Sequence, residues 1–382
     1  MAADPVYSDK EDNLLKGRSV FITGLGSYSP GEPVPFDEIE NVLGKIEGAS
    51  PKVLKRIEKM RPIVKEMLGI EFAYYALDPK TREMTESNIS MAVKSANKAL
   101  ASAGIKNTDI DLIVYAGVLY DYMCPPSSAM VQEALGIPYC AEISIHSNCT
   151  AIYKAIQIAS DMIANGRYKN ALLVTSQLSS SILRAEYYNP KALTFDQAIL
   201  RWFLCDGAGA LVLSSEAGGG CGLEIESTYL ESVGMGLDPC MKMECGAIKW
   251  NTLEIYENGW HHLTQDISKV TQLAHDIFRD GFLKMLNNYD TDVSTIKCFF
   301  LNIPTRHFMD VAIKNIKRDL KNPDLPVYTN LRTRGYQGAP SIVIALDEYM
   351  QNAKLTRGDC LMSFVTESSK WMNAGFILKY CG

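Results

Sequence analysis

The sequence lacks the features that mark membrane, secreted and nucleic-acid-binding proteins. It has no run of about eighteen uncharged apolar residues, so we expect no membrane-spanning helix. Its first residues, MAADPVYSDKEDNLLKG, are polar and contain no apolar core, which argues against a secretory signal and favours a cytoplasmic protein. It has no basic surplus either: the formal net charge is −6, so we expect no nucleic-acid partner.

Cysteine is present, but its spacing shows no pairing rhythm. The nearest pair among the ten cysteines, Cys240 and Cys245, does not have the spacing of a zinc knuckle, so we predict no metal site. Reduced thiols are expected in a long chain without a signal peptide. Most of these cysteines should therefore be small core residues.

The sequence does contain a regular alternation of apolar strands and amphipathic helices. Strands are predicted over Ser19–Gly24, Asp111–Gly117, Glu142–His146, Ala171–Ser176, Ala210–Ser214, Cys298–Ile303, Asp359–Val365 and Gly375–Tyr380. Helices are predicted over Glu86–Ala103, Ala129–Leu135, Thr150–Ile163, Gln265–Met285, Met309–Leu320 and Ser341–Gln351. Continuous apolar strands between helices are typical of sheets that helices cover on both faces.

A glycine-rich tract at 218–222 divides this pattern near its middle. We therefore predict a disordered lead over 1–17, a first half over 18–217 and an architecturally similar second half over 218–382. A helical insertion over Asp37–Met67 interrupts the first half, and a loop-rich insertion over Glu231–His262 interrupts the second.

One cysteine differs from the others in its surroundings. Cys149 lies in the segment Ile145–Ala151 (IHSNCTA), where an expected strand turns directly into an expected helix. Backbone N–H groups at a helix start stabilise a thiolate and can hold an oxyanion. The position therefore suits a nucleophile that forms an acyl thioester, while a small thiol packed in a turn is the structural alternative.

A second segment, Phe203–Leu213 (FLCDGAGALVL), carries small residues in front of a buried strand. Glycine and alanine there allow close approach of another element, and we expect Asp206 to bond backbone donors.

Together the two segments resemble the β-ketoacyl-acyl-carrier-protein synthase III family of the thiolase superfamily. The resemblance extends to Ser19–Gly26 (SVFITGLG), Cys124–Ile137 (CPPSSAMVQEALGI) and Asn373–Tyr380 (NAGFILKY). It implies a five-layer α-β-α-β-α fold of two fused similar halves, a homodimer, and ping-pong acyl transfer through Cys149. It also implies coenzyme A or carrier-protein phosphopantetheine thioesters as substrates, with no permanently bound cofactor.

The family's catalytic histidine has no direct counterpart. Its P-H-Q-A-N-like motif reads PTRHFMD at Pro304–Asp310, which places Thr305 at the histidine position in a gap-free alignment. A shift of two residues makes His307 the candidate base, and a surface or structural histidine is the alternative.

Three further motifs of the family are altered. The asparagine turn reads RGYQGAPS at Arg334–Ser341, so Tyr336 or Gln337 replaces the asparagine. We take Gln337 as the third candidate catalytic residue because its amide can donate a hydrogen bond. The glycine-rich loop that shapes the family's oxyanion hole is replaced by ESSK at Glu367–Lys370. The family's basic G-I-R-x-R segment reads GIEFAYY at Gly69–Tyr75, which puts the usual coenzyme A contacts in doubt.

These departures disfavour ordinary fatty-acid initiation, because decarboxylative condensation must stabilise an enolate oxygen. We therefore predict acyl transfer in specialised, polyketide or fatty-acyl-derived metabolism, either by condensation or by O- or N-acyl transfer. A catalytically degenerate subunit that supports an active partner of the same fold is the alternative.

The other histidines considered, His146, His261 and His262, are weaker candidates for a catalytic or metal-binding role. His146 precedes Cys149 by three residues on the expected strand and is expected to face away from the thiol. His261 and His262 lie in the loop-rich insertion without a carboxylate or cysteine at ligand spacing, so we expect them at the surface.

Overall fold

A computed structural model describes residues 17–288 and 292–382, and the predicted lead over 1–17 lies outside these residues except for Gly17. The principal strands are β1 (Phe21–Tyr28), β4 (Leu112–Gly117), β5 (Ala141–His146), β6 (Asn170–Gln177), β7 (Gly207–Ser214), β8 (Leu223–Ser232), β11 (Ile296–Leu301), β12 (Val327–Tyr328), β13 (Cys360–Glu367) and β14 (Met372–Tyr380). They form one sheet in the order β12-β11-β13-β14-β8-β1-β7-β6-β4-β5.

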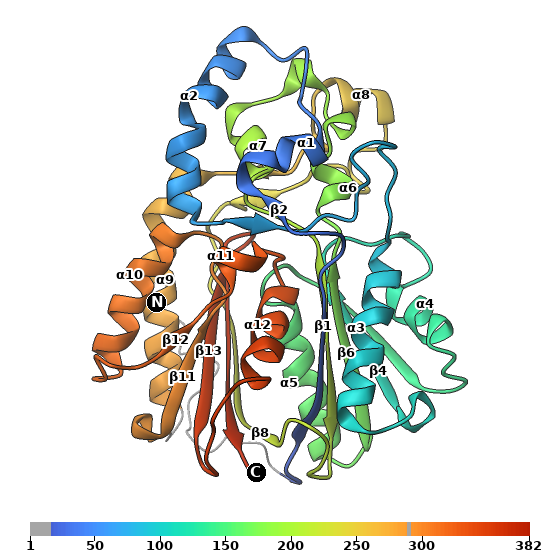
Figure 1. Ribbon diagram of the computed structural model, residues 1–382, viewed down its shortest axis with the longest axis vertical. Helices are drawn as coiled ribbons and strands as arrows, with labels where there is room; N and C mark the ends of the chain where they lie inside the picture. Colours follow the sequence, from blue (N-terminus) through green and yellow to red (C-terminus); the bar gives the residue numbers. More distant parts are fainter. Residues whose placement is uncertain (1–16, 289–291) are drawn as a thin grey trace.

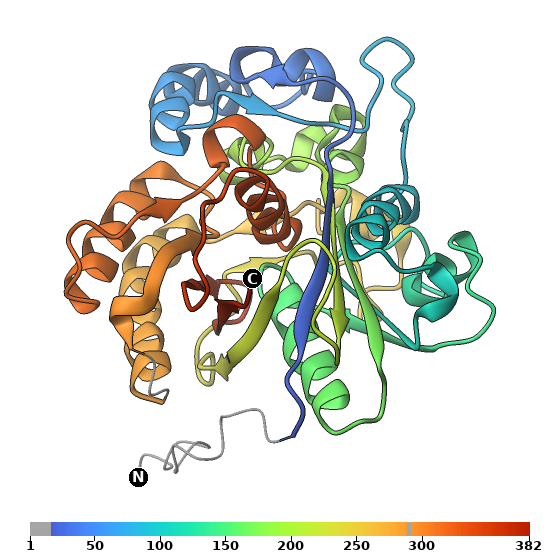
Figure 2. The same cartoon turned by 60° about the horizontal axis from the view of Figure 1, so that its bottom comes forward.

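The sheet consists of two parts that meet at a short seam. Strands β1 and β8 pair only through Phe21 with Glu224 and Ile22 with Leu223. On one side of the seam lie β1, β7, β6, β4 and β5, and on the other lie β8, β14, β13, β11 and β12. Because the seam is short, the two groups of strands diverge and leave room for helices between them (Figure 2).

Helices fill three layers around the two groups of strands. They are α3 (Asn88–Ala103) and α4 (Ser127–Ala134) on one outer face, α5 (Ala151–Ala164) and α12 (Pro340–Met350) in the middle, and α9 (Ile267–Asn288) and α10 (Arg306–Asp319) on the other outer face. Figure 1 shows these layers side by side, with α9 and α10 at the left and α3 and α4 at the right. The predicted five-layer α-β-α-β-α architecture is confirmed.

A further group of elements lies beyond one end of the strands, at the top of Figure 1. They are α1 (Ile39–Leu43), α2 (Pro51–Leu68), α6 (Ser180–Leu183), α7 (Phe195–Leu200), α8 (Thr252–Glu257), α11 (Leu331–Arg334), β2 (Val34–Pro35), β3 (Phe72–Ala73), β9 (Met241–Lys242) and β10 (Thr264–Gln265). We call this group the cap. The helical insertion predicted over Asp37–Met67 corresponds to α1 and α2, and the loop-rich insertion predicted over Glu231–His262 contains α8 and β9.

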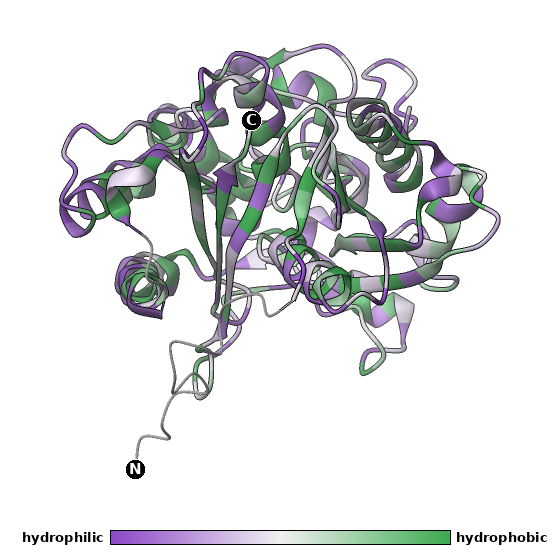
Figure 3. Cartoon of the chain, turned by 90° about the horizontal axis from the view of Figure 1, so that it is seen from below, coloured by the Kyte–Doolittle hydropathy of each residue, from purple (hydrophilic) through white to green (hydrophobic). Residues whose placement is uncertain are grey.

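The interior is apolar, as the hydrophobic stretches along the strands in Figure 3 show. Helix α5 is buried on most of its surface because strands of both groups pack against it, and its apolar residues Ile152, Ile156 and Ile163 lie in the central core. None of the helices in the described residues is long and apolar enough to cross a membrane.

The small residues at the start of β7 allow the close packing that the sequence predicts. A methyl group at Gly209 would lie 2.5 Å from Cβ of Val343, so α12 sits directly on this strand. Asp206 is fully buried, and its carboxylate accepts hydrogen bonds from the backbone N–H groups of Ala76 (2.7 Å) and Ser180 (2.8 Å). Burial raises the pKa of Asp206 to about 6, against these bonds.

Candidate active site

Cys149 lies in the turn that joins β5 to α5, one residue before the capping position of the helix. The turn is fixed at its start by a bond from the Ser147 backbone N–H to the Gly117 carbonyl (3.2 Å). Cys149 is half-buried and packs against both the central core and the core of the cap. The sulfur therefore lies where the layered body meets the cap.

The nearest polar partner of the sulfur is a tyrosine. The hydroxyl of Tyr336, a buried residue between α11 and α12, donates to Cys149 Sγ at 2.9 Å. Burial raises the pKa of Tyr336 well above its ordinary value, with the neighbouring Cys149 adding to the effect, so the phenol remains a proton donor. Tyr336 stands in the turn where the resemblance places the family's asparagine.

Gln337, the candidate named from the sequence, is placed differently. Its side-chain amide donates to the Arg334 carbonyl (2.5 Å) and to Cys205 Sγ (3.4 Å), and its side-chain oxygen accepts from Ser341 (2.9 Å). These partners hold Gln337 in the protein interior, so Tyr336 and not Gln337 contacts the sulfur of Cys149.

A carboxylate occupies the start of α5. Glu367, at the end of β13, is only 2% exposed. One of its oxygens accepts from the backbone N–H of Thr150 (3.0 Å), the hydroxyl of Thr150 (2.6 Å) and the hydroxyl of Ser147 (3.0 Å). The other oxygen accepts from Ser369. Glu367, the first residue of the segment that stands in place of the family's glycine-rich loop, thus lies where helix N–H groups would otherwise hold an oxyanion.

This arrangement reverses the electrostatics expected at a helix start. Burial of the thiol, and secondly the Glu367 carboxylate, raise the pKa of Cys149 to about 12, while the bonds from Tyr336 and from the backbone N–H of Cys149 act in the opposite direction. The expectation of a thiolate poised by free amides is wrong for this structure, because the N–H of Thr150 already bonds Glu367. The surroundings of the sulfur therefore favour the thiol over the thiolate.

An apolar hollow of about 130 Å³ lies beside the site, between α9 and the start of α10. Its walls include Phe278 and Phe308, and Thr366 and Ser368, the residues on either side of Glu367, also line it. Asn302 lines the hollow as well, is 3% exposed, and has a side-chain oxygen without a hydrogen-bond partner in the described part of the chain. Cys149 is not part of this lining.

His307 belongs to this hollow and not to the immediate surroundings of the sulfur. It is exposed in the first turn of α10, and its ring lies 6.0 Å from that of Phe308. Burial, and then the neighbouring His307, lower the pKa of His275, which lines the same hollow. Among the described residues, no hydrogen bond or ring contact joins His307 to Cys149.

The remaining histidines divide into one exposed and two buried residues. His146 is exposed and its ring lies 5.4 Å from that of Tyr120, on the other side of the strand from the interior. His261 and His262 are buried, so their predicted surface position is wrong: the insertion folds onto the cap core. The backbone N–H of Asn189 donates to Nε2 of His262 at 2.9 Å. Burial, and then His261, lower the pKa of His262 to about 4.

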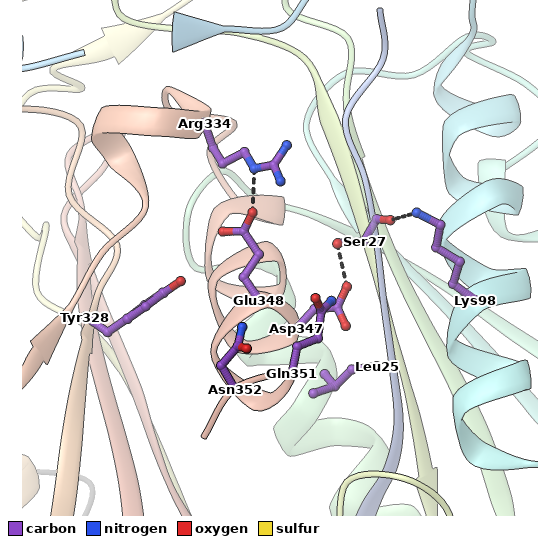
Figure 4. A pocket seen from close by; sticks show the side chains of 9 residues that line it. All are labelled: Leu25, Ser27, Lys98, Tyr328, Arg334, Asp347, Glu348, Gln351 and Asn352. Carbon is purple, nitrogen blue, oxygen red and sulfur yellow. Dashed lines mark hydrogen bonds and ion pairs between the residues drawn. The ribbon is translucent and has the colours of Figure 1, made fainter. Parts of the chain in front are cut away.

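A larger, polar hollow of about 720 Å³ lies along α12, away from Cys149 (Figure 4). Its charged groups are already engaged: Arg334 bonds Glu348 (2.5 Å), Ser27 bonds Asp347 (2.5 Å), and Lys98 bonds the Ser27 carbonyl (2.8 Å). In the described residues there is no group of three or more metal-ligating side chains. Cys149 with Tyr336 and Glu367 is therefore the candidate active site.

The chain is similar in sequence to known proteins. Residues 60–246, just under half of the chain, match the family described as Stage V sporulation protein AD. A β-ketoacyl-[acyl-carrier-protein] synthase III of Clostridioides difficile (strain 630) is 27% identical over 276 residues, which cover 72% of this chain and 78% of that protein. The same enzyme of Clostridium perfringens (strain SM101 / Type A) is 24% identical, over 88% of this chain and 92% of the relative.

Solved structures agree on the fold. A tetronic acid condensing enzyme superposes with a TM-score of 0.77 at 18% identity, covering 94% of this chain and 99% of that one. The 3-oxoacyl-[acyl-carrier-protein] synthase III of Aquifex aeolicus VF5 gives 0.72 at 18% identity, over 94% and 100% of the two chains. The protein therefore has the thiolase fold.

Within that fold class, the chain is similar to β-ketoacyl-acyl-carrier-protein synthases III, from which it diverges in sequence. These relatives are named as β-ketoacyl-[acyl-carrier-protein] synthases III, and at 24–27% identity this chain is distant from them.

Proposed function

We propose that the chain transfers acyl groups by a ping-pong mechanism through a thioester on Cys149. The observation that carries the proposal is the sulfur at the β5–α5 turn with the Tyr336 hydroxyl 2.9 Å away. In the first step a bond forms between the sulfur and the acyl carbon of a thioester donor, the donor's carbon–sulfur bond breaks, and the thiol proton passes to the leaving sulfur. In the second step an acceptor takes the acyl group and Cys149 recovers its proton.

The residues around the sulfur favour transfer without decarboxylation. Condensation of a malonyl thioester requires donors for an enolate oxygen, but Glu367 already bonds the helix N–H of Thr150. Tyr336 remains as a donor at the sulfur. The unpartnered oxygen of Asn302 in the apolar hollow suits an acceptor with a hydroxyl or amine proton to donate. His307, in the same hollow, is our candidate base for this acceptor.

We propose coenzyme A or carrier-protein phosphopantetheine thioesters as the donors, used as substrates and not as resident cofactors. The support comes from the relatives, which are named as acyl-carrier-protein synthases. Gln337, held by Arg334 and Ser341, acts in this proposal by fixing the turn that carries Tyr336.

We also propose that the chain forms a homodimer through β5. This strand is the edge of the sheet, and its apolar residues Ala141, Ile143 and Ile145 are only half-buried. Tyr139, just before it, is 89% exposed. An unpaired edge with apolar side chains is a template for strand pairing. Sedimentation should give twice the chain mass of 42.3 kDa, and Tyr139→Asp, at the exposed start of this edge, should give the single chain.

The second candidate function is a catalytically degenerate subunit. Glu367 at the helix start and the raised pKa of Cys149 favour it, because both oppose a nucleophilic thiolate. The match to a family described as a sporulation protein, and not by a reaction, is compatible with it.

Intact-protein mass spectrometry with a panel of acyl thioesters separates the two candidates. We expect an adduct of the acyl mass on the wild-type chain and none on Cys149→Ala. Absence of an adduct with every donor tested would favour the degenerate subunit. Release of CO₂ from malonyl thioesters, measured in parallel, distinguishes condensation from simple transfer.

A further inference from the structure

A lysine one turn into α5 is connected to the carboxylate at the helix start. Lys154 is half-buried, and its ammonium group donates to the hydroxyl of Ser147 at 2.8 Å. Ser147 is itself buried and donates to Glu367 at 3.0 Å. The chain of contacts therefore runs from Lys154 through Ser147 to Glu367, and it encloses the turn that carries Cys149.

Neither Lys154 nor Glu367, the two ends of this series of contacts, has another ionic partner among the described residues. Within ranges 17–288 and 292–382, Glu367 and Lys154 take part in no direct ion pair, and the hydroxyl of Ser147 is their link. The ammonium also contacts the sulfur of Met372, 3.3 Å away. Two opposite charges that share one bridging hydroxyl offset each other while remaining separate.

The proposed function gives this network a role at the sulfur. We propose that Glu367, Ser147 and Lys154 are positioning residues that set the protonation state of Cys149: the carboxylate holds the group as a thiol, and the lysine offsets that carboxylate. Three observations support the assignment. Glu367 is buried, it accepts hydrogen bonds from Thr150, the residue next to Cys149, and the hydroxyl of Ser147 connects it to Lys154.

The other titratable groups near the sulfur, Tyr336 and Tyr153, do not set the protonation state of Cys149 in place of Glu367 and Lys154. Tyr336 donates to Sγ and remains protonated, and Tyr153, on α5, is a buried phenol whose hydroxyl is paired with Ser363 (2.8 Å). Removing the negative charge at Glu367 should therefore favour the thiolate of Cys149, and removing the positive charge at Lys154 should disfavour it. A purely structural role predicts no such opposition, because loosening the turn in either variant would expose the sulfur.

The test measures alkylation of Cys149 by iodoacetamide between pH 7 and pH 10, with the modified peptide quantified by mass spectrometry because the chain has ten cysteines. We expect Glu367→Gln to accelerate modification by about tenfold, since a nearby unit charge shifts a pKa by about one unit or more. We expect Lys154→Met to slow it by several-fold and Lys154→Arg to restore most of the wild-type rate.

Rates that move in the same direction in Glu367→Gln and Lys154→Met, or that remain at the wild-type value in both, would overturn the proposal. Thermal unfolding of each variant shows whether it is folded, and if Glu367→Gln does not fold, the Lys154→Met and Lys154→Arg pair alone carries the test. Alkylation needs no acyl donor. If the alkylation rates of the two variants shift in opposite directions but Cys149 is not acylated, the network stands and the proposed function fails. If Cys149 is acylated but the rates do not shift in this way, the proposed function stands and the network fails.

Discussion

Replacing Tyr336 with phenylalanine removes the hydroxyl that contacts the sulfur of Cys149 and leaves the ring in place. The bond is 2.9 Å long, and the hydroxyl acts against the burial and the carboxylate that raise the pKa of Cys149. A hydrogen bond to a charged group contributes about 1.5–3 kcal/mol, and one to a neutral thiol contributes less. The pKa of Cys149 should therefore rise by about one unit or more in Tyr336→Phe.

At a fixed pH below that value, the fraction of thiolate falls with the pKa, so alkylation of Cys149 should slow by about tenfold. The assay is peptide-resolved alkylation at pH 8 and pH 9. Tyr75→Phe is a matched control, because the hydroxyl of Tyr75 is buried without a hydrogen-bond partner among the described residues. Alkylation of Tyr336→Phe at the wild-type rate or faster, or equal slowing in Tyr75→Phe, would refute this reasoning.

Three further predictions concern stability and turnover. His262 has a folded-state pKa of about 4, below its ordinary value of 6.5, so its contribution is present above pH 6.5 and is lost as the pH falls towards 4. Urea unfolding should show a loss of about 2 kcal/mol between pH 7.5 and pH 4.5, and His262→Gln should remove this part of the pH dependence. Gly209→Ala should destabilise the protein by about 1–3 kcal/mol, measured by urea unfolding, because the new methyl group overlaps Val343; unchanged stability would contradict the packing of α12 on β7. His307→Ala should reduce acyl turnover while Cys149 loading remains near wild type, and unchanged turnover would mean that the base has been assigned to the wrong residue.

The sequence predicts the layered body because its strands are continuous apolar runs with helical patterns between them. The order β4, β5, α5 and β6 follows from local signals, and so does the position of Cys149 at the β5–α5 turn. Strand β8 is absent from the predicted elements. It follows a glycine-rich tract and reads LEIESTYLES, in which charged and hydroxyl residues alternate with Leu223 and Ile225, so the apolar run is broken.

The site itself depends on contacts between distant parts of the chain. Glu367 bonds Thr150 across 217 positions, and Tyr336 reaches Cys149 across 187. Sequence spacing does not show which of two adjacent turn residues faces the sulfur: the amide of Gln337 suits the role by its chemistry, but Tyr336 makes the contact. The departure of the glycine-rich loop is visible in the sequence, but only the folded chain shows that Glu367 points to the helix start.

The burial of His261 and His262 also depends on contacts between distant parts of the chain and is not visible in the sequence. A loop-rich segment has no periodic pattern that reveals which of its faces is covered. In the structure the cap supplies that cover, and the rings of Tyr187 and Tyr188 lie 5.0 Å and 4.8 Å from His261 and His262.

The central claim is that Cys149 carries an acyl group during turnover. The most direct measurement is fragment mass spectrometry of the protein after brief incubation with an acyl donor, followed by treatment of a duplicate with neutral hydroxylamine. We predict that the acyl mass lies on the peptide that contains Cys149 and that hydroxylamine removes it, as expected for a thioester. An acyl group on another residue, or a Cys149 peptide that stays unmodified while product accumulates, would contradict the claim.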